Sequence, residues 1–199
     1  ADVTDRDQIK NAFDEARRAN GPIEILIVNA GIAESAPFHK MTRESWDRII
    51  ATNLTAAFDC AQAATGDLLA SENGRLVFVA SVASLRGVPY AAHYAASKHG
   101  LLGLSRVMAK EGAAHNVRAN VVCPGFVKTP LVEKQIPEQA KELGISEDEV
   151  IKNVMLKETV DGEFTTLDDV ARCAAFLAAF PSNALTGQSI VVSHGWAMQ

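Results

Sequence analysis

The chain has 199 residues, which is enough for one domain with a sizeable core and too few for two comfortable ones. Its formal net charge of −5 disfavours nucleic acids and anionic membranes as partners, because both attract basic surfaces. Apolar stretches such as residues 23–30 are far too short to span a bilayer, and no secretory leader is expected from the opening residues. We therefore expect neither a nucleic-acid-binding protein nor a membrane protein.

Three cysteines, Cys60, Cys123 and Cys173, lie far apart and form no CxxC pair. Each is flanked by apolar residues, so we expect buried, reduced thiols in a cytoplasmic protein. Their spacing supports neither a metal site nor thiol catalysis.

Helical and strand-like segments alternate along the chain. Thr4 with Asp7 is typical of a helix-opening cap, and the helix should stop at Asn20-Gly21. Thr42 opens a long helical pattern. We expect helices at residues 4–20, 42–69, 94–113 and 167–179, and strands at residues 23–28, 75–80, 117–122 and 189–193.

The strand-like segments are nearly continuous apolar runs rather than alternating ones. Such runs are required in a parallel sheet that helices cover on both faces. Strands that alternate with helices through short connections indicate an α/β fold with a doubly wound parallel sheet, similar to a Rossmann fold.

Two segments are less regular. Residues 129–165 are polar, charged and helical in patches, and we expect them to form a mobile lid over the carboxyl ends of the strands. The opening residues contain no Gly-rich phosphate-binding turn and begin as if leaving a strand. We therefore expect residues 1–199 to be the carboxyl-terminal part of a single Rossmann-like domain that lacks its first βαβ half. By itself, such a part should fold poorly and bind nucleotide weakly.

Tyr94 and Lys98 lie four positions apart on a helical segment, so their side chains share one face. A phenol is a poor base at neutral pH, and a neighbouring ammonium should lower its pKa toward the working range. Ser81 ends the preceding strand, where its hydroxyl could bind a substrate oxygen. Taken singly, the pair could be solvated surface residues and Ser81 a helix cap.

Five ordered elements give these residues a common context. They are Asn29-Ala-Gly31 after a strand, Asn53 in a long helix, Ser81 thirteen residues before Tyr94, Tyr94-Ala-Ala-Ser-Lys98, and Pro124-Gly125 after the third strand. Together they resemble the short-chain dehydrogenase/reductase family over essentially the whole chain. The resemblance implies an NAD(P)-dependent oxidoreductase that interconverts a secondary alcohol and a ketone by hydride transfer.

The resemblance also implies roles for four catalytic residues. Tyr94 would be the general acid/base, and Lys98 would lower its pKa and bind the nicotinamide ribose. Ser81 would position the reacting oxygen of the substrate. Asn53 would hold a water that connects Lys98 to solvent, although a simple helix kink is a competing interpretation of an asparagine inside a helix.

The cofactor implied by the resemblance is NAD, with NADP an open alternative. The residues that would border it are Asp2, Val3, Asn29, Ala30, Gly31, Tyr94, Lys98, Pro124, Gly125, Val127 and Thr129. The resemblance further implies a homotetramer that acts on a small molecule, without a metal.

A narrower resemblance links the carboxyl-terminal half to bacterial D-3-hydroxybutyrate dehydrogenases. It rests on residues 129–136, 155–159, 180–188 and 193–196. It implies that Gln135 and Trp196 face a small acid substrate. Gln135 could equally face solvent, and Trp196 could be a packing residue at a subunit contact.

Three positions depart from that narrower pattern. The resembled enzymes carry a glutamine, a histidine and a lysine where this chain has Ala33, Ala83 and Ala91. Those polar groups would grip the substrate carboxylate, so their loss removes charge-assisted hydrogen bonds to a small anion.

Three functions therefore stay open. The leading one is oxidation of 3-hydroxybutyrate to acetoacetate and the reverse reaction. The second is reduction of a 3-oxoacyl thioester, including one on acyl carrier protein, or of ketones in general. The third is a catalytically silent fragment or interaction protein. The five histidines are interpreted as structural or surface residues; they are His39, His93, His99, His115 and His194.

Overall fold

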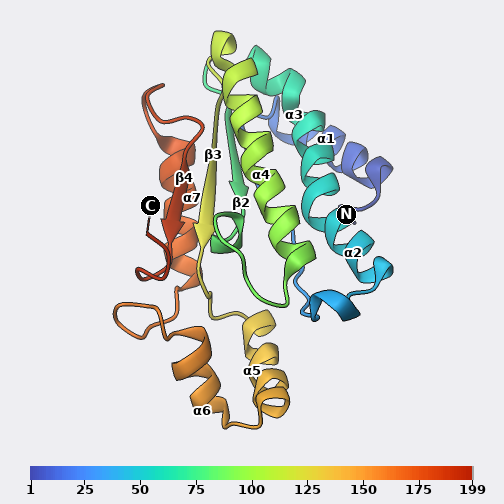
Figure 1. The fold of residues 1–199 in the computed structure, drawn as a ribbon. Helices are drawn as coiled ribbons and strands as arrows, with labels where there is room; N and C mark the ends of the chain where they lie inside the picture. Colours follow the sequence, from blue (N-terminus) through green and yellow to red (C-terminus); the bar gives the residue numbers. More distant parts are fainter. Residues whose placement is uncertain (199) are drawn as a thin grey trace.

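The computed structural model describes residues 1–198 and shows an α/β fold with helices on both faces of one sheet (Figure 1). The sheet has four strands in the order β1-β2-β3-β4, and every neighbouring pair is parallel. The strands are β1 (Ile25–Val28), β2 (Arg75–Val79), β3 (Arg118–Pro124) and β4 (Ser189–Val192). The predicted fold class and all four predicted strands are confirmed.

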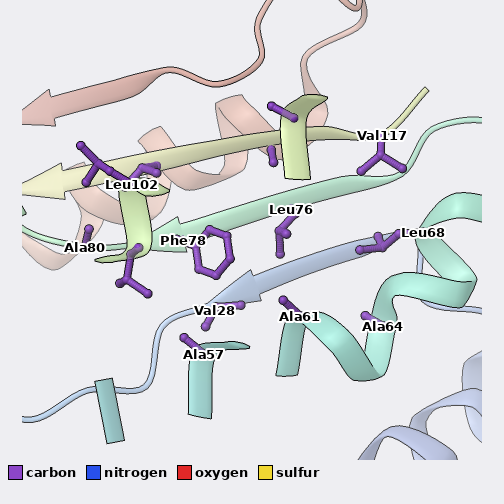
Figure 2. Packing of buried hydrophobic residues seen from close by; sticks show 14 of the residues in the cluster. Val28, Ala57, Ala61, Ala64, Leu68, Leu76, Phe78, Ala80, Leu102 and Val117 are labelled. Atoms are coloured by element: carbon purple, nitrogen blue, oxygen red, sulfur yellow. The ribbon is translucent and has the colours of Figure 1, made fainter. Parts of the chain in front are cut away.

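Successive side chains of the central strands enter two separate cores, which explains their continuous apolar sequence. Leu76 and Phe78 face the helices α3 (Ala56–Ala70) and α4 (Ala92–Glu111), as Figure 2 shows for the α3 side. Val77, between them in β2, packs on the opposite face against α7 (Leu167–Ala179). Because both faces are covered, apolar residues are required at most positions of these strands, and a buried polar residue such as Asn120 has hydrogen-bond partners.

The first helix, α1 (Arg6–Asn20), begins two residues later than the predicted range of 4–20. Asp5, not Thr4, is its cap: the Asp5 carboxylate accepts hydrogen bonds from the backbone N–H groups of Asp7 and Gln8. Thr4 instead donates its N–H and its hydroxyl to Asp2. The prediction of a Thr4 cap is therefore wrong, because a neighbouring carboxylate engages that hydroxyl.

The predicted helix from Thr42 to about residue 69 is confirmed, with an unforeseen irregularity. The Thr42 hydroxyl caps α2 (Arg43–Ile50), which continues through a π-helical turn, η2 (Ala51–Thr55), into α3. Such turns inside helices often coincide with functional sites. Short 3-10 turns complete the order of elements: η1 (Phe38–Lys40), η3 (Val82–Ser84) and η4 (Ala113–His115).

Residues 129–165 lie beyond the carboxyl ends of the strands, as predicted (Figure 1). They form α5 (Pro130–Leu143), α6 (Glu147–Val150) and a π-helical turn, η5 (Ile151–Met155). A small hydrophobic cluster around Val132, Val150 and Met155 holds them together apart from the main core. One parallel bridge, Val127 with Thr165, ties the base of this segment. A lid function for it stays a prediction.

The three cysteines are free thiols, as predicted. Cys123 is buried, whereas Cys60 and Cys173 are half-buried, so complete burial is confirmed for Cys123 alone. Over residues 1–198, no helix combines the length and the apolar character needed to cross a bilayer.

Helix α4 approaches η2 closely because Gly100 has no side chain. A Cβ atom at Gly100 would lie 2.7 Å from Cδ1 of Leu54. By contrast, a Cβ atom at Gly66 in α3 would meet no heavy atom within 4 Å. Gly100 therefore sets the spacing between the two helical segments that carry Asn53 and Lys98.

We predict that Gly100→Ala lowers the free energy of unfolding by about 1–3 kcal/mol, because the added methyl overpacks the contact with Leu54. The same change at Gly66 should raise stability by about 0.5–1 kcal/mol through helix propensity. Denaturant unfolding of both variants measures the difference. Equal stabilisation in both variants would contradict a tight contact at Gly100.

Candidate active site

The predicted catalytic residues come together at the carboxyl edge of the sheet. Ser81 lies two residues beyond the end of β2, and Tyr94 and Lys98 lie in the first two turns of α4. Asn53 reaches the same place from η2. Ligands bind at this edge in open α/β sheets, so the topology itself places the four side chains where a substrate can reach.

Asn53 is completely buried and bonds other segments rather than its own helix. Its Oδ1 accepts from the N–H of Ile32 at 2.8 Å, and its Nδ2 donates to the carbonyl of Ile32 at 2.9 Å. Nδ2 also donates to Oγ of Ser97 at 3.2 Å, and Ser97 donates to the carbonyl of Tyr94 at 2.7 Å. Asn53 thus joins the loop after β1 to α4, which a helix kink alone would not require.

Lys98 carries a buried ammonium. Its Nζ donates to the carbonyl of Val79 at 3.0 Å, its one hydrogen bond within residues 1–198, and lies 5.8 Å from the centre of the Tyr94 ring. Burial lowers the pKa of Lys98 to about 8. A Cβ atom at Gly31 would lie 3.3 Å from Nζ of Lys98 and 3.3 Å from Oδ1 of Asn53, so glycine keeps the approach to these two groups open.

The Ser81 side chain acts on the Tyr94 phenol. Burial raises the pKa of Tyr94, and the Ser81 side chain opposes that rise. The sequence suggested that Lys98 lowers this pKa; Lys98 is not among the groups that shift it, and its ammonium donates to the carbonyl of Val79. Ser81 also accepts from the N–H of Ala83 at 3.1 Å, so it is both a cap of η3 and a partner of the phenol.

Cys123 lies beneath these residues at the end of β3. Burial raises the pKa of its thiol to about 11, with hydrogen bonds from the Ser81 backbone and the Ser84 side chain acting in the opposite direction. The thiol is therefore neutral at ordinary pH, and Cys123 is part of the main hydrophobic core below the site. Nothing in the sequence pattern indicated that Cys123 lies close to Ser81.

Trp196 occupies the border between the strands and residues 129–165. Its ring stacks on Phe126 with centres 4.9 Å apart, and the Arg86 guanidinium lies 5.5 Å from its centre. Arg86 also donates to the Trp196 carbonyl at 3.1 Å and pairs with Glu158 at 3.0 Å. A Cβ atom at Gly125 would lie 3.4 Å from this ring. Sequence reasoning missed Arg86, whose signal was a lone basic residue between Ser81 and Tyr94.

The remaining residues that were predicted to border the cofactor or the substrate make fewer contacts with Ser81, Tyr94, Lys98 and Asn53. Asn29, Ala30 and Gly31 are exposed after β1, as a ligand-facing stretch requires. Asp2 is engaged by Thr4 and Gln8. The other positions are placed as follows: Val3 and Gln135 half-buried, Pro124 buried at the end of β3, Val127 bridged to Thr165, and Thr129 capping α5.

The three alanines of the substrate pattern supply only methyl groups. Ala83 and Ala91 are buried, and Ala33 is half-buried. His93 and His99 also follow their prediction as structural or surface residues: His93 is completely buried, and His99 is exposed.

Known proteins are similar to this chain over its full length. A family model described as enoyl-(acyl carrier protein) reductase matches residues 1–197. A D-beta-hydroxybutyrate dehydrogenase of Rhizobium meliloti is 38% identical over 199 residues, which is 100% of this chain and 77% of the relative. The 3-oxoacyl-[acyl-carrier-protein] reductase FabG of Thermotoga maritima is 38% identical over 193 residues, 97% of this chain and 74% of the relative.

A third relative has a different named substrate. An acetoacetyl-CoA reductase of Rhizobium meliloti is 34% identical over 175 residues, 88% of this chain and 68% of the relative. The motifs, the parallel sheet and these matches agree, and the chain belongs to the short-chain dehydrogenase/reductase family of oxidoreductases.

Proposed function

We propose that the chain interconverts 3-hydroxybutyrate and acetoacetate by hydride transfer, with Tyr94 as the general acid/base. The observation that carries this proposal is the convergence of Ser81, Tyr94, Lys98 and Asn53 at the carboxyl edge of the sheet. The likeness to a D-beta-hydroxybutyrate dehydrogenase supports the choice of substrate.

The arrangement fits a nicotinamide nucleotide. The Lys98 ammonium has three N–H donors and uses one of them on Val79, which leaves two for ribose hydroxyls. The exposed residues 29–31 allow a close backbone approach, and Pro124 and Gly125 would border the nicotinamide. We propose NAD as this nucleotide and a homotetramer as the assembly, both on the resemblance. When bound, the nucleotide supplies or accepts the hydride.

Each catalytic residue would act on a proton or an oxygen. Tyr94 donates its phenolic proton to the substrate oxygen during reduction and takes it back during oxidation. Ser81 donates a hydrogen bond to the same oxygen and keeps it beside the phenol. Lys98 stabilises the phenolate once its ammonium turns toward Tyr94, and Asn53 with an associated water would return protons from solvent.

Residues 129–165 would cover the bound substrate as a lid. Their hydrophobic cluster is separate from the main core, which allows them to move as a unit. The ion pair between Glu158 and Arg86 links this segment to the loop that follows Ser81. Closure would exclude water from the reacting atoms.

We predict that Tyr94→Phe lowers kcat by about 10²–10⁴-fold while the protein stays folded, because only the proton donor is removed. Tyr90→Phe is the matched control, since Tyr90 is 61% exposed in the loop before α4. Steady-state kinetics and thermal unfolding of both variants provide the test. Turnover of Tyr94→Phe close to that of an active wild type would refute the assignment, whereas absence of turnover in the wild type itself would favour a catalytically silent protein.

We predict that Lys98→Met stabilises the nucleotide-free protein by about 2 kcal/mol below pH 8, after the lost hydrogen bond is counted. The folded-state pKa of about 8 lies below the ordinary 10.5, so burial of the charged form opposes folding. That cost is fully present below pH 8 and disappears as pH rises through 10.5, where lysine is neutral in both states. The stabilisation should therefore fade over this interval.

Unfolding free energies at pH 7 and pH 10 measure this effect. Lys110→Met is the control, because Lys110 lies in the same helix and is exposed. A Lys98 variant whose stability relative to wild type is independent of pH would contradict the lowered pKa.

The substrate end of the site supports weak selection for a free acid. Ala33, Ala83 and Ala91 offer no hydrogen bond to a carboxylate, and the charge of Arg86 is already balanced by Glu158. This favours, as a second candidate, reduction of a 3-oxoacyl thioester, for which two of the relatives are named.

We predict that kcat/KM for 3-hydroxybutyrate exceeds that for its thioester and for neutral secondary alcohols by less than about tenfold. Each absent charge-assisted hydrogen bond corresponds to about 1.5–3 kcal/mol of binding. Ala91→Lys should raise kcat/KM for the free acid and leave the neutral alcohols unchanged. A strong wild-type preference for the free acid would mean that another group, with Arg86 the first to test, holds the carboxylate.

A further inference from the structure

Helix α4, which carries Tyr94, begins without a capping side chain. Its N-cap residue is Ala91, whose methyl group accepts no hydrogen bond. The first backbone N–H groups of a helix need acceptors from outside the helix, and Ser, Thr, Asp or Asn ordinarily supply one from the N-cap position. At α4 the N–H of Tyr94 finds that acceptor elsewhere: Nδ1 of His93 lies 2.9 Å away.

The imidazole of His93 is completely buried, and its partners determine where its proton lies. Nδ1 accepts from Tyr94, so in the neutral ring Nε2 carries the hydrogen. Nε2 lies 3.1 Å from Oγ of Ser45 in α2 and can donate to it. A neutral histidine with both ring nitrogens used in this way has one tautomer only.

Ser45 is itself oriented by a carboxylate. Its hydroxyl donates to Oε2 of Glu34 at 2.7 Å, which leaves an oxygen lone pair for the His93 Nε2–H. The other oxygen of Glu34 accepts from Nε of Arg48 at 2.8 Å. The hydrogen bonds therefore form a chain in which each group donates to the next, from the Tyr94 backbone N–H through His93 and Ser45 to Glu34.

We propose that His93 is a positioning residue for Tyr94, held in the required tautomer by Ser45 and Glu34. The proposal rests on the catalytic role of Tyr94 proposed above. Proton transfer requires the phenolic oxygen within hydrogen-bond reach of the substrate oxygen, and a frayed first turn would displace it. His93 replaces the missing cap at the turn where that displacement would begin.

This arrangement depends on the protonation of His93. A proton on Nδ1 converts the acceptor into a second donor facing the Tyr94 N–H, so the contact is lost. Burial lowers the pKa of His93, while the carboxylate of Glu34 raises it and the guanidinium of Arg48 lowers it. The net direction is downward, so the contact persists at neutral pH and kcat falls only as pH decreases below the ordinary histidine range.

Two substitutions of His93 test the contributions of its two ring nitrogens separately. Asparagine at position 93 places its carbonyl oxygen near the location of Nδ1, whereas glutamine places its amide nitrogen near that of Nε2. We expect His93→Gln to lower kcat about tenfold with KM little changed, because the Tyr94 N–H loses its acceptor. His93→Asn should recover most of that loss, and its pH profile should lack the acid decline that the wild type shows.

Thermal unfolding verifies that both variants are folded, and a readout without turnover separates this proposal from the proposed function. Nitrogen NMR of the wild type should show the Nε2–H tautomer of His93, and hydrogen exchange at the Tyr94 amide should be faster in His93→Gln than in His93→Asn. A wild type without dehydrogenase activity would defeat the proposed function, while the tautomer and the exchange rates would still test the capping contact. Two results would overturn the positioning role. One is equal kcat in His93→Gln and His93→Asn, with both variants keeping the decline in kcat at acid pH that the wild type shows. The other is an Nδ1–H tautomer of His93 in the wild type.

Discussion

The buried ammonium of Lys98 is the constraint on which the site depends. A charge in this position is costly, and within residues 1–198 a single carbonyl, that of Val79, accepts a hydrogen bond from it. The neighbouring positions accommodate it: Gly31 leaves room above Nζ, and Gly100 lets α4 approach the turn that carries Asn53. The same charge that lowers stability is the one that can later stabilise a phenolate.

The backbone of Tyr94 is held on both of its polar groups by residues distant in the sequence. Its N–H donates to His93, which Ser45 orients, and its carbonyl accepts from Ser97, which Asn53 orients. Both supports originate in the continuous helical segment formed by α2 and η2. Precise placement of the phenol therefore comes from packing between helices rather than from α4 alone.

The two ends of the site differ in how firmly they are built. At the end proposed to transfer protons, each polar group has a defined partner. At the end proposed to hold the substrate, Ala33, Ala83 and Ala91 supply only methyl groups, and Arg86 is bonded to Glu158 and to the carbonyl of Trp196. Chemistry is thus specified more tightly than substrate, which agrees with likeness to relatives named for an acid and for thioesters.

The sequence by itself determined the fold class, because uninterrupted apolar strands are compatible only with a sheet covered on both faces. It also determined that Tyr94 and Lys98 share a helix face, because helical spacing is a local property. Tertiary structure alone decided the π-helical turn at Asn53, the hydrogen bond of Lys98 to the carbonyl of Val79, and the use of His93 as a cap. These features depend on contacts between residues as far apart as Ser45 and His93, and local periodicity carries no information about such contacts.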